Sequence, residues 1–571
     1  MQTSMKSLGV CWMVSVVLLG QGCGGGGSSA PANIATAPAA TQPVATPVPP
    51  APTTPPAVPV PANSVIISGK ATFESVPARD NGALNYAAIV DRPARGATIQ
   101  ALSGSTVLAS TSVDEQGSFS MTLPINTSYF LRLRAELIST VGPATWTAAV
   151  KDNTSGNALW VVDGQTSSSG TSNASRSVSA GSGWNGSSYT PGARAAGPFA
   201  ILDTIYTSFK FITRTQPTVN FPPLDVFWSP NNTSAGSSTN DPATGELGGT
   251  FFLEKTVNGV LTRSIYVLGQ ENDDTDEYDS ALVGHEIGHY VQSAFSSDHS
   301  LGGSHSRVNR LDMTLAFSEG WGTAWSSMMR GNPIYADSFG LGQSRGFMFS
   351  VLSVPTDADR GWYREDSVFS ALYALFASHG FAPIWQTLTG PMLKSQDALA
   401  TVFSFADGLR SAGNAAVTTT LNSVFSAQRI YTGSGADQWG AGETNNGGSA
   451  DNLPLYSLLA FNTATPVCFS NENQVGTSRN KLGMVKYFRI KLSAAQAGLR
   501  TVTANFQTGR DLDFEVLQNR VLVLAAGKDS LGEASESASG NLSAGEVVIR
   551  VSDFITTAPP VSPNCATLTI R

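Results

Sequence analysis

One short motif constrains this chain more than any other feature: His285-Glu286-Ile287-Gly288-His289. The 571-residue sequence contains only five histidines, so a chance H-E-x-x-H has a probability of about one in a thousand. Side chains four positions apart on a helix project from the same face. The motif therefore predicts a helix that Asp279 or Ser280 caps and that runs to about Phe295, with both imidazoles on one side.

Two histidines at this spacing are the usual start of a zinc site. They hold one Zn²⁺, and Glu286, one position on, takes a proton from water that the zinc activates for attack on a carbonyl. The alternative is a structural helix with two core histidines. Because so few histidines are available, the catalytic interpretation is favoured, with His285 and His289 as metal ligands and Glu286 as the general base.

A catalytic zinc needs a third protein ligand. The candidates are Glu319, on a second helix predicted for residues 312–329, and His299 and His305 in the polar loop between the helices. Glu319 is favoured because a carboxylate on a closely packed helix face is costly unless it is paired or bound to metal. The small residues that share its face are Ala316, Gly322 and Thr323.

Two supporting roles remain open at the level of sequence. Histidines bound to zinc usually donate their second ring N–H to a carboxylate, and the candidates are Asp298, Asp312 and Asp366. Peptide hydrolysis also needs a donor to the developing oxyanion. Tyr363, just before an apolar helix, is the first choice, and His305 or neither residue is the alternative.

An acidic run precedes the motif helix. Its carboxylates favour the positive N-terminus of that helix, so the simplest interpretation is a solvated loop. The alternative is a calcium site, since Ca²⁺ takes clustered oxygen ligands. The run comprises Glu271, Asp273, Asp274, Asp276, Glu277 and Asp279.

With Glu319 on a following helix, the motif resembles the gluzincins, the thermolysin-like branch of zinc metallopeptidases. The resemblance covers roughly residues 195–430 and implies a mostly helical α+β zincin-like core. It also implies a zinc-dependent peptidase of the endopeptidase kind. Gluzincins often carry an Asp four residues after this Glu, to support a zinc-binding His, whereas this chain has Thr323.

The N-terminus predicts export. Lys6 is the only charge in the first 23 residues, and Leu8–Leu19 is an apolar stretch of 12, too short to span a bilayer. Followed by Cys23 and a run of glycines, residues 1–23 resemble a bacterial lipoprotein signal, which implies lipidation of Cys23. Residues 24–63 carry no charge and many prolines, which predicts an extended tether. The expected location is the outer membrane, with free secretion as the alternative.

Strand-like alternation dominates residues 64–150, which predicts an antiparallel β-sandwich. The succession of Gly69, Pro93-Ala94-Arg95-Gly96-Ala97 and Asp114-Glu115-Gln116-Gly117-Ser118-Phe119 resembles carboxypeptidase-regulatory-like domains. Residues 151–194, rich in Ser and Gly, predict hairpins and loops.

Residues 465–571 again alternate with period two, after a Gly- and Asn-rich linker at 431–464, and predict a second β-sandwich. Gly509-Arg510-Asp511-Leu512-Asp513-Phe514 and the later Ala544-Gly545-Glu546 resemble the bacterial pre-peptidase C-terminal domain, a module that is often trimmed off. Cys468 and Cys565 lie near the two ends of this module, and a disulfide between them is expected in an oxidising compartment.

The sequence thus predicts a multidomain protein whose metallopeptidase core is flanked by two β-sandwiches. Its net charge of −8 argues against a nucleic-acid partner. The expected partners are protein or peptide substrates and, through the lipid, a membrane, while the oligomeric state stays open. The rival hypothesis is a surface-anchored adhesin or matrix-binding lipoprotein whose zincin domain is catalytically silent.

Overall fold

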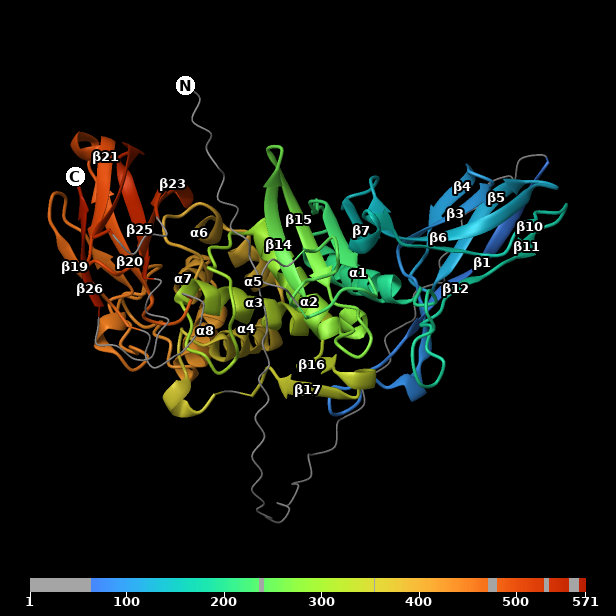
Figure 1. Cartoon of the computed structure of the whole chain (residues 1–571), viewed down its shortest axis with the longest axis horizontal. Helices are drawn as coiled ribbons and strands as arrows, with labels where there is room; N and C mark the ends of the chain where they lie inside the picture. Colours follow the sequence, from blue (N-terminus) through green and yellow to red (C-terminus); the bar gives the residue numbers. More distant parts are fainter. Residues whose placement is uncertain (1–62, 236–240, 354, 471–479, 528–532, 554–563) are drawn as a thin grey trace, which may run out of the picture.

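The structure, a computed structural model, describes residues 63–235, 241–353, 355–470, 480–527, 533–553 and 564–571. The predicted signal segment, the lipidation site Cys23 and the tether up to residue 62 lie outside the described residues. Along the long axis of the molecule, a β-rich N-terminal region is followed by a helical central region and a C-terminal β-sandwich (Figure 1). The chain is therefore multidomain, with β-sandwich-like parts around a helical centre. No helix in these ranges is long and apolar enough to cross a membrane.

Alternate residues are buried along the longer strands of the N-terminal region, as the period-two pattern predicts. In β6 (Ser128–Ser139), Leu131 and Leu133 are buried, whereas Arg132 and Arg134 form partly exposed ion pairs. One sheet contains β1 (Ser64–Ser75), β2 (Val90–Pro93), β5 (Ser118–Pro124), β11 (Ala174–Ser175) and β12 (Val178–Ala180).

A ten-stranded sheet runs from this region into the centre of the molecule, in the order β14-β15-β13-β7-β6-β3-β4, with β8, β9 and β10 beside it. Its strands besides β6 are β3 (Ala97–Ser103), β4 (Thr106–Ser112), β7 (Trp146–Asp152), β8 (Ala158–Leu159), β9 (Val161–Asp163), β10 (Ser167–Ser168), β13 (Leu224–Trp228), β14 (Phe251–Val257) and β15 (Val260–Val267). Because β7 pairs with β13, the expected boundary at residue 150 falls inside a strand that joins two regions. Within the described residues, β14 ends the sheet order and is an edge strand.

Two long helices carry the motif residues, with bounds close to those predicted: α2 (Ser280–Phe295) and α3 (Met313–Arg330). Asp312 caps α3, since its carboxylate accepts a hydrogen bond from the Thr314 N–H at 2.9 Å. Asp279 precedes α2 but does not cap it, because its carboxylate accepts hydrogen bonds from Ser338 instead. The other α-helices of the described residues are α1 (Gly197–Thr215), α4 (Glu365–His379), α5 (Ala382–Leu388), α6 (Pro391–Lys394), α7 (Val402–Ser411) and α8 (Ala415–Ala427).

The C-terminal region is a sandwich of two sheets. One contains β18 (Tyr456–Leu458), β20 (Val485–Leu492), β22 (Leu512–Gln518), β23 (Val521–Ala526) and β25 (Gly545–Asp553). The other contains β19 (Thr465–Phe469), β21 (Gly498–Asn505), β24 (Ser535–Leu542) and β26 (Asn564–Ile570). Cys468 in β19 and Cys565 in β26 lie opposite each other and form the predicted disulfide. The expected linker at 431–464 supplies β18, which pairs with β20.

The first sheet of the sandwich has two buried faces. Along β20, Phe488 and Ile490 belong to the core of the sandwich itself. Val485 and Tyr487 point the other way, into the hydrophobic core shared with the helices. The sandwich is therefore packed onto the helical region through a continuous apolar core.

Candidate metal site

The predicted ligands His285, His289 and Glu319 converge between α2 and α3, and all three are buried. Nε2 of His285 lies 3.1 Å from Nε2 of His289 and 3.1 Å from Oε2 of Glu319, and the third side of the triangle is 3.6 Å. Bonds of about 2.0–2.1 Å to a tetrahedral ion place its ligands about 3.3 Å apart. The triangle therefore has the size of a zinc site with three protein ligands.

Glycines allow the two helices to come this close. A Cβ atom on Gly288 would lie 2.8 Å from the Cα of Gly322, and a Cβ on Gly322 would lie 2.9 Å from Cε1 of His285. Neither position has room for a larger residue. The small residues predicted on the Glu319 face thus bring its carboxylate to the imidazoles.

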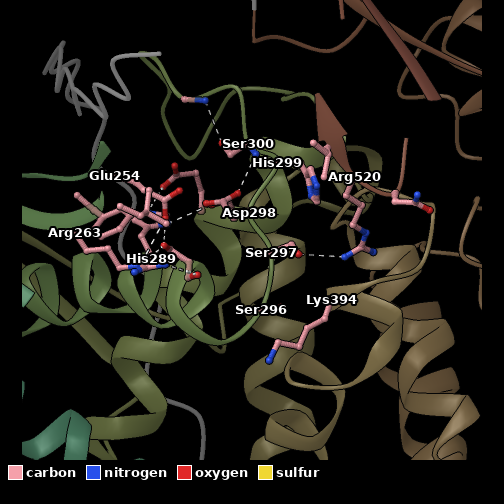
Figure 2. A pocket seen from close by; sticks show the side chains of 18 residues that line it. Glu254, Arg263, His289, Ser296, Ser297, Asp298, His299, Ser300, Lys394 and Arg520 are labelled. Carbon is pink, nitrogen blue, oxygen red and sulfur yellow. Dashed lines mark hydrogen bonds and ion pairs between the residues drawn. The ribbon is translucent and has the colours of Figure 1, made fainter. Parts of the chain in front are cut away.

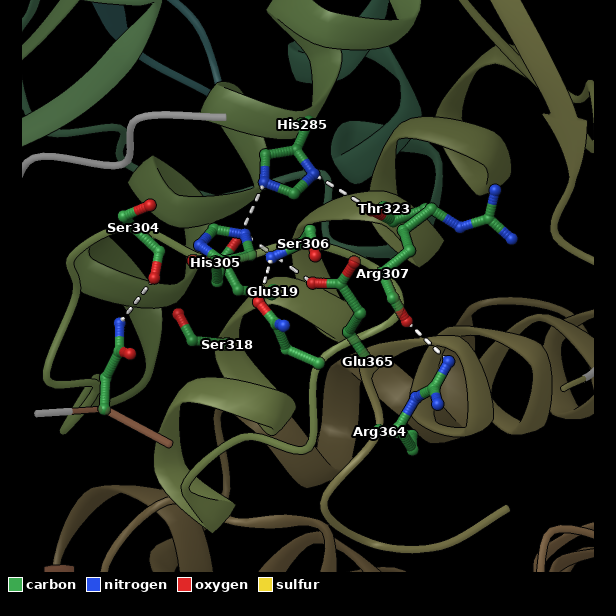
Figure 3. A network of polar contacts seen from close by, with 12 residues as sticks. His285, Ser304, His305, Ser306, Arg307, Ser318, Glu319, Thr323, Arg364 and Glu365 are labelled. Atoms are coloured by element: carbon green, nitrogen blue, oxygen red, sulfur yellow. Dashed lines mark hydrogen bonds and ion pairs between the residues drawn. The ribbon is translucent and has the colours of Figure 1, made fainter. Parts of the chain in front are cut away.

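Each candidate histidine ligand is oriented through its second ring nitrogen. Nδ1 of His285 lies 3.0 Å from Oγ1 of Thr323, and Nδ1 of His289 lies 3.3 Å from Oγ of Ser318. The Ser318 hydroxyl donates to Asp298 at 2.9 Å, so its lone pairs face the imidazole. Hydrogen bonds at Nδ1 leave the Nε2 lone pairs directed at the centre of the triangle. Figure 3 shows the contact of His285 with Thr323.

Of the three carboxylates predicted to support the ligands, only Asp298 is linked to one of them, through the Ser318 hydroxyl. Asp312 caps α3 and accepts from the Tyr487 hydroxyl at 2.9 Å. Asp366 pairs with Arg307 at 3.2 Å. Thr323 occupies the position where gluzincins often carry Asp, and its hydroxyl contacts His285 in place of a carboxylate.

The Glu319 carboxylate is buried among imidazoles. Burial opposes ionisation of Glu319, but the charges of His305 and His289 outweigh it and hold its pKa well below its usual value. Burial also lowers the pKa of His289, but the Glu319 carboxylate outweighs this and raises it to about 9. In the absence of metal, the carboxylate is thus compensated only by imidazole protons, which a divalent cation would replace.

Glu286 lies beside this triangle with nothing bound to one of its oxygens. Oε2 is buried and has no hydrogen-bond partner among the described residues. Burial raises the pKa of Glu286 to about 8. A hydrogen bond from the Phe252 backbone on β14 acts in the opposite direction and lowers this pKa. A buried carboxyl oxygen without a partner is costly unless another group bonds to it.

His305 also reaches the site, whereas Tyr363 does not join it. Nε2 of His305 lies 3.3 Å from Oε2 of Glu319 and 3.6 Å from Oε2 of Glu365. The Tyr363 hydroxyl lies within hydrogen-bonding distance of the Arg360 carbonyl (3.1 Å) and of Oδ1 of Asn445 (3.2 Å). Of the two oxyanion donors considered from the sequence, His305 is therefore the one beside the candidate ligands.

A pocket of about 360 Å³ opens next to the triad (Figure 2). His289 and Glu319 line it, together with Phe252 of β14 and the loop of residues 296–302 that follows α2. His299, the other alternative third ligand, lies in this wall, where its Nδ1 accepts a hydrogen bond from the Ala400 N–H at 3.1 Å. The turn between β22 and β23 also contributes to the lining.

Residues of the C-terminal region hold the loop after α2 that lines this pocket, which the sequence did not predict. Arg550 of β25 donates to the His299 carbonyl at 3.0 Å. Asn480 and Lys481 donate to carbonyls of the same loop, at Gly302 (2.7 Å) and Ser304 (2.6 Å). The loop that leads to His305 is thus held by residues more than a hundred positions away.

The acidic run before α2 is not the expected solvated loop, because Asp276, Glu277 and Asp279 are buried and its other acids are half-buried. Asp274 and Asp276 meet Asp337 of β16 (Ile334–Phe339), with carboxylate oxygens within 4.8 Å of one another. Each has a buried oxygen without a hydrogen-bond partner among the described residues. Burial raises the pKa of Asp276 to about 7 and, together with neighbouring carboxylates, raises that of Asp337 well above its usual value.

The remaining acids of the run have protein partners. Glu277 pairs with Arg194. Asp273 accepts from Ser234, and Glu271 from the Tyr189 N–H at 2.9 Å. Asp274 and Asp276, which meet Asp337, are therefore the acids of the run whose charge no cationic side chain of the described residues neutralises. Asp337, 58 residues after Asp279, is the member of this aspartate cluster that no local pattern indicated.

Comparisons with known proteins give no family assignment. No protein family and no curated protein matches this chain. Among solved structures, the C-terminal region resembles the pre-peptidase C-terminal domain of a collagenase from Bacillus anthracis, with 8% identity over 20% of this chain and 94% of that one and a TM-score of 0.16. A periplasmic inhibitor of g-type lysozyme from Aeromonas hydrophila matches with 13% identity over 20% of this chain and 96% of that one, at a TM-score of 0.14. At these scores the likenesses carry no argument about function.

Proposed function

We propose that this chain is a zinc-dependent peptidase, of the endopeptidase kind, in which His285, His289 and Glu319 hold the metal. The observation that carries the proposal is the triangle of ligand atoms beside the unpaired Oε2 of Glu286. Imidazole nitrogen and carboxylate oxygen are the ligands that zinc takes in hydrolytic sites. When bound, zinc acts as a Lewis acid that lowers the pKa of water to about 7.

The residues around the metal then have distinct roles. Glu286 takes the proton from the attacking water, and its burial and raised pKa suit it to pass that proton to the leaving amine. Burial lowers the pKa of His305, but the Glu319 carboxylate outweighs this and raises it to about 9. His305 therefore donates a hydrogen bond to the developing oxyanion. These assignments replace Tyr363 in that role.

A peptide substrate is favoured by the strand that borders the site. β14 is the edge of its sheet in the described chain, and Phe252 on it lines the pocket and contacts Glu286 through its backbone. An edge strand offers unpaired backbone groups to an extended peptide, which aligns by main-chain hydrogen bonds. The substrates in this proposal are proteins or peptides outside the cytoplasm.

The proposal extends to location and to a second ion. The Cys468–Cys565 disulfide supports an oxidising compartment, with attachment to the outer membrane through lipid on Cys23. The aspartate cluster is assigned to calcium, because Asp276 is fully buried with an unpartnered oxygen. Carboxylate oxygens are the ligands of this hard cation.

The test uses the purified full-length chain. We expect one zinc per chain by elemental analysis and cleavage of an unstructured protein. Glu286→Gln should keep the zinc and lose at least about a hundredfold of the rate, because the base is gone, whereas Glu319→Gln should lose the zinc. Glu115→Gln, on a surface carboxylate with 43% exposure, is the control and should change neither. Wild type with zinc but without turnover would favour the silent adhesin instead.

A further inference from the structure

The pocket beside the triad is closed at one end by the C-terminal sandwich. The turn between β22 and β23 places Asn519, Arg520 and Val521 in its lining, opposite the strands β14 and β15. Figure 2 shows Arg520 and Lys394 on the same side of the pocket, with His289 on the other. Since His289 and Glu319 belong to the same lining, this end is continuous with the candidate metal site.

Arg520 is held in a fixed position. Its Nη2 donates to the Met392 carbonyl of α6 at 2.5 Å, and its Nη1 lies 3.4 Å from Oγ of Ser297. Its Nε is buried and has no hydrogen-bond partner among the described residues. Burial lowers the pKa of Arg520 to about 10, and Tyr456 and Asp397 oppose this effect, so the guanidinium stays charged at neutral pH.

The second cation at this end is Lys394, the last residue of α6. Its side chain is exposed and lines the pocket. Among the described residues, neither Lys394 nor Arg520 forms an ion pair with a carboxylate. Two positively charged side chains therefore line the same side of the pocket without an ion-paired carboxylate from the described residues.

The acidic groups that line the same pocket are already engaged. Glu254 pairs with Arg263 at 3.7 Å. Asp298 accepts from Ser318 and from the Ser300 N–H, and Glu319 faces the imidazoles. His299, between the two ends, adds no charge, because burial and the neighbouring arginines lower its pKa to about 3.

We propose that Lys394 and Arg520 form a subsite for an acidic side chain of the substrate. The inference rests on the proposed peptidase function and specifies its substrate class: peptides with Asp or Glu at the position that reaches this end of the pocket. The charge of Arg520, which is partly shielded from water, discriminates more strongly between carboxylate and ammonium than an exposed charge does. In this arrangement the C-terminal sandwich takes part directly in selecting the substrate.

The test uses the full chain and sets of fluorogenic peptides that are identical except for Glu, Gln or Lys at one position, moved stepwise along the peptide. We expect one position at which kcat/KM for Glu exceeds that for Lys by about tenfold or more, mainly through KM, because the contact is made in the ground state as well. Lys394→Glu should reverse this preference at that position alone. Arg520→Gln should reduce it, and Arg520→Lys should retain part of it.

Lys491→Glu is the matched control, since Lys491 is exposed on β20 and does not line the pocket. It changes the net charge equally and should leave the preference intact. Wild type that cleaves all three peptides equally at every position would overturn the subsite while leaving the peptidase in place. If the double variant Lys394→Glu/Arg520→Gln kept the preference of wild type, the subsite would also be overturned while the peptidase stayed in place. If no peptide is cleaved by wild type, both proposals fail.

Discussion

At the scale of single residues, the candidate metal site depends on hydroxyl groups rather than on the carboxylates expected around it. Ser318 directly precedes Glu319 on α3, and Thr323 lies one turn after it. Each of these hydroxyls contacts the Nδ1 of one histidine. One helix thus provides both a ligand and the groups that orient the other two. The spacing of these residues was visible in the sequence, but their function was not, because Ser and Thr are common on packed helix faces.

Thr323→Ala should weaken zinc binding. Second-sphere partners of metal-bound histidines contribute about ten- to a hundredfold in affinity, and the alanine leaves Nδ1 of His285 without a partner. Competition with a chromophoric chelator measures the change. Thr323→Ser keeps the hydroxyl and should bind zinc nearly as tightly as wild type. Equal affinities for the Ala and Ser variants would contradict the role of the hydroxyl.

At the scale of elements, α2 and β16 bring the aspartates together. Asp274 and Asp276 precede α2, and Asp337 lies on β16, in the hairpin with β17 (Arg345–Ser350). Ser338, next to Asp337, donates to Asp279 at the start of α2 and so fixes the strand beside the acidic run. A cation here would join the motif helix to the hairpin.

Calcium should therefore stabilise the folded chain. At a hundredfold excess over its Kd, a ligand of the native state contributes about 2.7 kcal/mol. We expect the melting temperature of wild type to rise with calcium in EGTA-buffered solutions with zinc held constant. Asp276→Asn with Asp337→Asn should abolish the rise. That variant should also melt above calcium-free wild type, because it removes uncompensated buried carboxylates.

The control for this experiment is Asp407→Asn, on a helix where Asp407 pairs with Arg410 at 3.4 Å. It should respond to calcium as wild type does. If the melting temperature of wild type did not depend on calcium, the assignment of the aspartate cluster to calcium would be excluded.

At the scale of the whole molecule, the C-terminal sandwich is packed into the central region instead of hanging from a linker. Val485 and Tyr487 enter the shared core, and Arg550 and Lys481 hold the loop before His305. Tyr487 also donates to Asp312, the capping residue of the helix that carries Glu319. This arrangement makes the sandwich a support for the candidate site.

Tyr487→Phe should lower the free energy of unfolding by about 1–3 kcal/mol, because the buried Asp312 carboxylate loses a hydrogen-bond donor. Urea unfolding measures the change. Tyr431→Phe is the matched substitution, since the Tyr431 hydroxyl bonds the Ser434 carbonyl in an exposed contact, and it should cost less than about 0.5 kcal/mol. Similar losses in both variants would show that the contact with Asp312 is unimportant.

The sequence alone determined the local features of this protein: the motif helix, the second helix with Glu319, the strand-rich ends and the cysteine pair. Each depends on a short-range period or spacing, which fixes the face on which a side chain lies. Which distant residues meet depends on tertiary packing. It brought Asp337 to Asp276, His305 rather than Tyr363 to Glu319, and Arg520 to the pocket. These contacts arise from the packing of elements far apart in the chain, and no local pattern encodes them.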